Sequence, residues 1–195
     1  MKNIAIFASG SGSNFEAIVN AAEKGEIPAK ISLLVCDRPE AYVIIRARTH
    51  GVPVFAFSPK DYAGKEAYEA EILERLRASD IHLIALAGYM RMVGETLLEA
   101  YPNRIVNIHP SLLPAFPGKD AIARAYQSGA KQTGVTVHYV DAGMDTGPVI
   151  AQRDVKVLEE DTEESLEERI HQTEHLLYIQ TLKSLLEQGE ESSQS

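Results

Sequence analysis

The sequence has few of the residues on which disulfide-rich, metal-stabilised or membrane-spanning proteins depend. It contains one cysteine, Cys36, and no tryptophan. A single cysteine excludes an internal disulfide and a multi-cysteine zinc site, and no apolar run approaches the ~20 residues of a membrane-spanning helix. No small-residue cleavage site follows the opening apolar run, so we expect a cytoplasmic protein with no membrane partner.

Basic residues are also too few for a nucleic-acid-binding surface. The 195 residues include 19 Lys and Arg against 28 Asp and Glu, giving a formal net charge of −9. Most of this charge lies in residues 156–195, and the rest of the chain is nearly neutral. We therefore expect no nucleic-acid partner, and we interpret the acidic segment as the solvated face of a helix followed by a tail.

Helical and extended patterns alternate from the start of the chain to residue 109. Near-continuous runs of Val, Ile, Leu and Ala are typical of strands in a sheet that helices cover on both faces. We expect strands at residues 4–8, 31–36, 52–57, 81–87 and 105–109, separated by helices near 14–24, 41–50, 62–78 and 94–101. This order predicts an α/β fold built on a Rossmann-like, doubly wound and mostly parallel sheet.

The pattern changes after Pro110. A loop rich in Pro and Gly leads to a short helix near residues 122–127, and two further strands are expected near 134–140 and 149–157. Only a glycine-containing turn separates these strands, so they should be antiparallel.

A long helix near residues 163–187 closes the chain. With 195 residues, we expect a single domain over residues 1–187. The polar, acidic residues 188–195 are expected to form a disordered tail.

The small residues GSGSN, at 10–14, separate the first expected strand from the first helix. Glycines let the backbone approach a ligand closely, and the N–H groups of a helix start favour an anion. The alternative is a tight turn with Ser13 as the N-cap. Phe15 stands where a dinucleotide fingerprint needs its third glycine, and no P-loop Gly-Lys-Ser/Thr is present, which favours one phosphomonoester over NAD or ATP.

Two polar side chains close the fifth expected strand. Asn107 and His109 are two residues apart, so they share a face of the sheet. They lie at the carboxyl end of the strand, where open α/β sheets bind ligands. This position favours a functional role over packing.

Thr136 and His138 likewise share a strand face, and Asp145 follows in a glycine-flanked turn. A carboxylate close to an imidazole favours its protonated form and raises its pKa from about 6.5. Asp145 could equally be a turn residue that bonds its own backbone.

Two other patterns leave structural and functional interpretations open. Residues 88–93, GYMRMV, could line a pocket for a flat ring or pack on the next helix. His171 and His175 have a spacing that can bind a metal, but no third ligand is near, so surface or core histidines are favoured and no metal is expected.

Several of these motifs together resemble the phosphoribosylglycinamide formyltransferases, a family of folate-dependent formyltransferases. The resemblance covers about residues 3–186, and its most specific parts are GSGSN at 10–14, AGYMRMV at 87–93, NIHPSLLP at 107–114 and GVTVHYVDAGMDTGPVI at 134–150. It implies transfer of a formyl group from 10-formyltetrahydrofolate, as co-substrate, to the amine of glycinamide ribonucleotide. No metal is required.

The resemblance also implies roles for individual residues, all named here by their numbers in this sequence. It places Asn107 and His109 as stabilisers of a tetrahedral intermediate, with Asp145 raising the pKa of His109. The remaining implied contacts are Gly12, Ser13 and Asn14 with the substrate phosphate, Lys65, Met90, Arg91, Met92, Val93 and Asp141 with the folate, and His138 and Glu174 with the substrate.

Three positions depart from the pattern of some relatives. Lys65 stands where some relatives carry Arg. A lysine keeps the positive charge but cannot make the bidentate contact that an arginine makes with a carboxylate. Asp120 stands where many have His, and His171 also differs, so neither receives a role. A formyltetrahydrofolate hydrolase, a non-enzymatic folate- or nucleotide-binding module and a nicotinamide oxidoreductase remain as rival interpretations. The sequence does not choose between a monomer and a homodimer.

Overall fold

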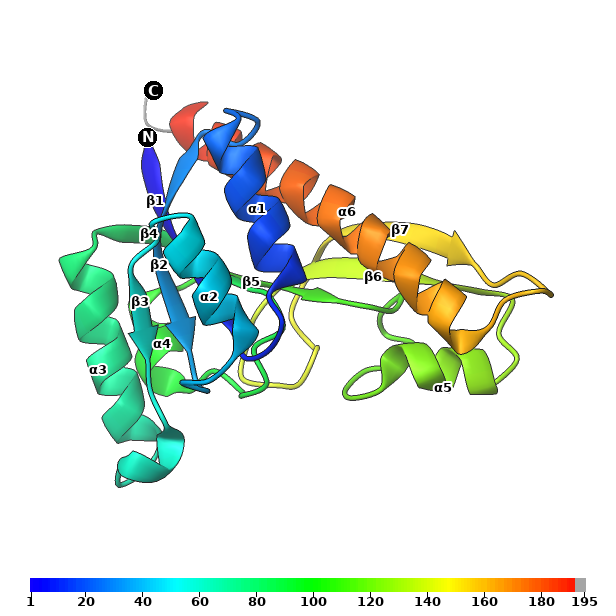
Figure 1. Ribbon diagram of the computed structural model, residues 1–195, viewed down its shortest axis with the longest axis horizontal. Coiled ribbons are helices and arrows are strands. Elements are labelled where there is room, and N and C mark those ends of the chain that lie inside the picture. The colour runs from blue at the N-terminus through cyan, green and yellow to red at the C-terminus, as the bar shows by residue number, and fades with distance from the viewer. Residues whose placement is uncertain (192–195) are drawn as a thin grey trace.

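The computed structural model describes residues 1–191 and places a seven-stranded mixed sheet at the centre of the molecule (Figure 1). The strand order is β3-β2-β1-β4-β5-β6-β7, parallel from β3 to β5 and antiparallel for β6 and β7. The strands are β1 (Lys2–Ala8), β2 (Ala29–Cys36), β3 (Val54–Ala56), β4 (Ile81–Leu86), β5 (Ile105–His109), β6 (Gln132–Tyr139) and β7 (Val149–Lys156).

Helices cover both faces of this sheet. The helices are α1 (Ser13–Glu23), α2 (Tyr42–Thr49), α3 (Lys65–Ala78), α4 (Glu95–Ala100), α5 (Ala121–Gln127) and α6 (Glu163–Glu191), with a 3₁₀ turn η1 (Pro59–Asp61). One buried cluster joins α1, α2 and α6 to one face, and a second joins α3 and α4 to the other. Alternate residues of β1 enter different clusters, Ile6 the first and Phe7 the second, as expected for a strand buried on both faces.

The predicted fold class is confirmed, including the antiparallel last strands and the long final helix. The boundaries differ in places. The third helix starts at Lys65 rather than near 62, because η1 and Gly64 precede it. The final helix continues to Glu191, beyond its last buried residue, Leu186. Residues 188–191, expected in the tail, are therefore helical, and 192–195 lie outside the described residues.

The order of the strands across the sheet changes direction at β1, which pairs with β2 on one side and with β4 on the other. The loops that follow β1 and β4 leave the sheet at its carboxyl edge, where β5 also ends. Open α/β sheets bind ligands in the crevice at such a reversal. The fold thus brings the segments after residues 8, 86 and 109 to one place. Among the helices of residues 1–191, none is long and apolar enough to cross a membrane.

Candidate active site

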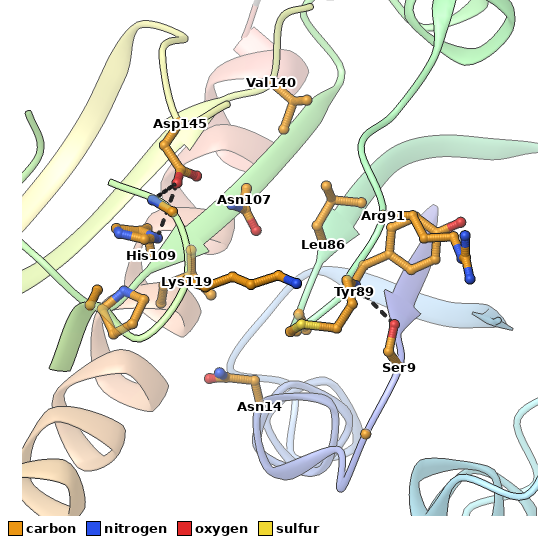
Figure 2. Close-up of a pocket in the computed structure, with 18 of the residues that line it drawn as sticks. Ser9, Asn14, Leu86, Tyr89, Arg91, Asn107, His109, Lys119, Val140 and Asp145 are labelled. Atoms are coloured by element: carbon orange, nitrogen blue, oxygen red, sulfur yellow. Dashed lines mark hydrogen bonds and ion pairs between the residues drawn. The ribbon is translucent and has the colours of Figure 1, made fainter. Parts of the chain in front are cut away.

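A cavity of about 760 Å³ opens at this edge of the sheet (Figure 2). This size suits a small-molecule site. Its walls come from segments far apart in the sequence: residues 9–14, 86–93, 107–110, 118–121 and 138–145, with His171 and Glu174 of α6. All the predicted site residues line it except Lys65.

The glycine-rich loop enters α1 through a left-handed residue. Gly12 has φ 82° and occupies the N-cap position, so Ser13 is the first helical residue and not the cap. A Cβ on Gly12 would lie 2.5 Å from Val43 Cγ2, because α2 packs directly against the loop. The first intrahelical bond runs from the Glu16 N–H to the Gly12 carbonyl, which leaves earlier N–H groups of the turn free for a ligand.

Glu174 joins this loop to the final helix. Its buried carboxylate accepts a hydrogen bond from Asn14 Nδ2 at 3.2 Å, and His171 Nδ1 lies 3.0 Å from the same oxygen. Hydrogen bonding to Glu174, and less strongly to Glu167, raises the pKa of His171. Glu174, the predicted substrate contact, and the predicted phosphate loop are therefore neighbours, and His171 belongs to the cavity wall.

Asn107 owes its partner to the antiparallel pairing of β5 with β6. It faces His138 in register, and its Nδ2 lies 3.3 Å from His138 Nε2. The other nitrogen, Nδ1, donates to the Tyr139 carbonyl at 2.8 Å, because a carbonyl can only accept. An Nε2 without a hydrogen accepts one from the Asn107 amide, whereas an Nε2 that carries one directs it toward Asp145 Oδ1, 3.7 Å away. The second hydrogen of the amide remains for a ligand.

Asp145 reaches over the end of β5 and meets His109. Its Oδ2 lies 3.5 Å from His109 Nδ1 and accepts the Gly118 N–H at 2.8 Å, as the dashed lines in Figure 2 show. Its Oδ1 lies 3.7 Å from His138 Nε2. His138 foremost, then the Gly118 N–H and the charge of His109, hold the pKa of Asp145 below its usual range, against the effect of burial.

The hydrogen bonds of His109 define which nitrogen faces the reaction. Nε2 lies 2.8 Å from the Phe116 carbonyl and must therefore carry a hydrogen. In the imidazolium form Nδ1 also carries one, directed toward Asp145 and the cavity. Nδ1, which lies 3.5 Å from Asp145 Oδ2, is therefore the ring nitrogen that faces the carboxylate and the cavity.

The cavity wall at residues 90–93 presents mainly apolar side chains, and hydrogen bonds with other segments hold it in place. Met90 is 60% exposed, and its N–H donates to Ser9 Oγ at 2.9 Å. Arg91 Nε donates to the buried Asp37 at 2.9 Å. Lys65 donates to the Met92 carbonyl at 2.7 Å, and its contact with the folate stays a prediction. Lys65 positions the wall rather than lining the cavity.

The remaining predicted residues take local roles in turns. The Asp141 carboxylate accepts the Thr146 hydroxyl at 2.7 Å and the Gly143 N–H at 3.0 Å, and both bonds lower its pKa. Asp120 is the left-handed N-cap of α5, with φ 56° and no side-chain cap bond.

Cys36 is fully buried, and burial raises the pKa of its thiol, as expected for a residue packed in the core. Residues 1–191 hold no group of three or more side chains arranged for a metal ion.

Sequence reasoning missed the contributions of the backbone and of Ser9. Ser9 directly precedes the glycine-rich motif, which is the signal that could have found it. Every residue has a backbone carbonyl and every residue except proline has an N–H, so no motif marks the Phe116 carbonyl or the Gly118 N–H. Both lie in the Pro/Gly-rich loop after β5, which was predicted only as a loop.

The chain is similar to known enzymes over nearly its whole length. The model of the formyl transferase family matches residues 2–182. The phosphoribosylglycinamide formyltransferase of Bacillus subtilis (strain 168) is 56% identical over 186 residues, which are 95% of each chain. The crystal structure of glycinamide ribonucleotide transformylase 1 from Geobacillus kaustophilus superposes with a TM-score of 0.93 at 64% identity, covering 95% of this chain and 99% of that one. Phosphoribosylglycinamide formyltransferase from Bacillus halodurans gives 0.92 at 55% identity, covering 95% of both.

The chain therefore belongs to the formyl transferase family. The B. subtilis relative and the two solved structures each match over 95% or more of their own length. Within the family, the chain accordingly belongs to the phosphoribosylglycinamide formyltransferases.

Proposed function

We propose that the protein transfers a formyl group from 10-formyltetrahydrofolate to the amine of glycinamide ribonucleotide, a step of purine biosynthesis in the cytoplasm. The observation that carries this proposal is the convergence of Asn107, His109 and Asp145 at one cavity. The glycine-rich loop and the exposed methionines Met90 and Met92 line the same cavity.

The two sides of the cavity suit the two substrates. The free N–H groups at the start of α1 suit a phosphate, and Glu174 beside Asn14 suits the ribose hydroxyls. The exposed methionine side chains suit a flat folate ring, since methionine packs adaptably against aromatic surfaces. The reacting groups of both ligands would then meet beside Asn107 and His109.

In the mechanism that this geometry supports, the neutral amine attacks the formyl carbon and a C–N bond forms. An α-amino group titrates near ~8, so a fair fraction is neutral at cellular pH without a strong base. The carbonyl oxygen becomes an oxyanion, which accepts a hydrogen bond from Asn107 Nδ2 and shares the Nδ1–H of His109 with Asp145. One such preorganised donor typically contributes about 3 kcal/mol to transition-state stabilisation.

A proton must then leave the new ammonium and reach the folate nitrogen as its bond to the formyl carbon breaks. Asp145 and His109 lie 3.5 Å apart and could hold a water that relays it. Asp145 also stabilises the positive charge of His109 throughout. No covalent intermediate with the enzyme and no metal is needed for these steps.

The test is to follow tetrahydrofolate release from 10-formyltetrahydrofolate with and without glycinamide ribonucleotide. We expect release only with the acceptor, in step with formation of the formylated ribonucleotide. Release without the acceptor would identify a hydrolase, and ligand binding without any release would identify a binding module. Titration with a nicotinamide cofactor checks the oxidoreductase alternative, and we expect no binding.

A further inference from the structure

The loop at residues 116–120 carries a cationic side chain that the mechanism above does not use. Lys119 lines the cavity, and Figure 2 shows it extended into the cavity between Asn107 and Asn14. Asn107 belongs to the reacting centre and Asn14 to the glycine-rich loop. The ammonium is therefore directed along the path between these two parts of the site.

The backbone on both sides of Lys119 is fixed by groups of the active site. The Phe116 carbonyl accepts the Nε2–H of His109, and the Gly118 N–H donates to Asp145. On the outer side, Arg124 of α5 donates to the Lys119 carbonyl at 2.9 Å and also to the Pro117 carbonyl. The origin of the side chain is thus held, although the ammonium itself is free to move.

Lys119 is one of few cations available to a ligand. Among the described residues that line the cavity, three side chains carry a permanent positive charge: Arg38, Arg91 and Lys119. Arg91 is bound by Asp37 at 2.9 Å. Within residues 1–191, the Lys119 ammonium has no hydrogen bond or ion pair. No side chain or backbone group of the described part of the chain therefore neutralises this charge by direct contact.

The phosphate of the acceptor needs such a charge. A phosphomonoester carries about −1.5 to −2 at neutral pH, whereas a helix N-terminus supplies only about +0.5. Arg46, which donates to the Ser11 carbonyl, is itself paired with Glu16 at 3.3 Å. Four carboxylates, those of Asp120, Asp141, Asp145 and Glu174, also line the described cavity and oppose an anion.

We propose that Lys119 is a specificity-determining residue that binds the phosphate of the acceptor nucleotide, opposite the glycine-rich loop. The inference rests on the proposed function and adds a permanently charged side chain to a phosphate site otherwise made of backbone N–H groups, small polar side chains and the nearby imidazole of His171. Its consequence is selection for a phosphorylated acceptor over the corresponding nucleoside, with little influence on the chemical step.

The experiment compares the unmodified protein with Lys119→Met and Lys119→Arg, using Lys60→Met as a control at an exposed lysine that does not line the cavity. Steady-state assays give kcat and the KM of each substrate, and inorganic phosphate is tested as a competitive inhibitor against the ribonucleotide. In Lys119→Met we expect the KM of the ribonucleotide and the inhibition constant of phosphate to rise about tenfold, the effect of one charge-assisted hydrogen bond. The kcat and folate KM should stay within twofold, and Lys119→Arg should recover most of the loss.

Three results would overturn the inference. An unchanged KM of the ribonucleotide would mean that the ammonium stays in solvent. A lower kcat at constant KM would place it on the reacting oxygen, and a rise confined to the folate KM would place it on the folate carboxylates. If the unmodified protein makes no formylated product, the proposed function itself fails. Calorimetric titration of inorganic phosphate into unmodified and Lys119→Met protein still tests Lys119 in that case.

Discussion

Asp145 has a backbone conformation that few residues other than glycine adopt. Its φ is 56°, and Phe116 and Asp120, which belong to or border the loop that it contacts, have φ 50° and 56°. Each left-handed residue of this kind costs on the order of 1 kcal/mol or more, and such costs gather at functional sites. The bond from the Gly118 N–H to the Asp145 carboxylate joins the two strained turns. This bond offsets part of the backbone cost and holds the carboxylate near His109.

The charge of Asp145, rather than its shape, should matter for turnover. Asparagine has the same size and tolerates a positive φ, so Asp145→Asn removes the charge near His109 and His138 with little disturbance of the turn. We expect kcat at saturating substrates to fall at least tenfold, because the protonated imidazole loses its counter-charge. Circular dichroism checks the fold, and Asp154→Asn on β7 is the control. Turnover within twofold of the unmodified enzyme would contradict the role of Asp145.

Substitutions in the glycine-rich loop should raise the KM of one substrate more than the KM of the other. The double variant Ser13→Ala, Asn14→Ala removes a hydroxyl and the amide that contacts Glu174. We expect the KM of the ribonucleotide to rise more than the KM of the folate, since only the former carries the phosphate. Steady-state kinetics with each substrate varied in turn measures both. An equal rise for the two substrates would remove this loop from the phosphate site.

At the scale of elements, the contact between α1 and α2 sets the position of the phosphate loop. Gly12 packs against Val43, and the Val43 N–H donates to the Gly10 carbonyl at 3.1 Å. His50, the C-cap of α2, lies 2.8 Å from both Glu16 and Glu23 of α1. The two helices are therefore joined at both ends of their interface.

The close approach of Gly12 to Val43 predicts that alanine substitution destabilises the protein far more at Gly12 than at Gly10. Gly12→Ala forces a left-handed alanine and places its Cβ against Val43, so we expect a loss of roughly 1–3 kcal/mol in the free energy of unfolding. Gly10→Ala is the matched control, because its Cβ would meet nothing within 4 Å. Urea denaturation of the three proteins measures the difference. Equal midpoints for the two variants would show that the loop relaxes freely.

The His50 contacts predict a pH-dependent contribution to stability. Hydrogen bonds to Glu16 foremost, and then to Glu23, raise the pKa of His50 above 6.5. The stabilisation is therefore complete below pH 6.5 and is lost as the pH rises through the raised value. We expect His50→Gln to lower the free energy of unfolding by roughly 0.5–1 kcal/mol at pH 5.5 and by much less at pH 9. Denaturation at both pH values measures this, and a pH-independent loss would indicate packing instead.

At the scale of the whole molecule, the sheet was predictable because its strands are apolar throughout and its helices are periodic. The start of α3 was not, since the pattern does not distinguish residues 62–64, which lie between η1 and α3, from a first helical turn. The end of α6 was missed because residues 188–191 are polar, while the stripe that holds the helix ends at Leu186.

The candidate site was predictable where strand geometry decides it. Alternation along β5 places Asn107 and His109 together. Contacts between loops depend on tertiary packing, so the distance from Asp145 to His109 and the bond from Lys65 to the Met92 carbonyl could not be derived from spacing. A lysine on a helix gives no sign of whether it faces a ligand or the back of a loop.

The most direct test of the account is the rate of formyl transfer in a single turnover by His109→Ala, with binding of each substrate measured separately. The imidazole contacts the reacting oxygen only as charge develops, so the rate should fall at least tenfold while both dissociation constants change little. A folded variant that transfers the formyl group at nearly the normal rate would contradict the mechanism.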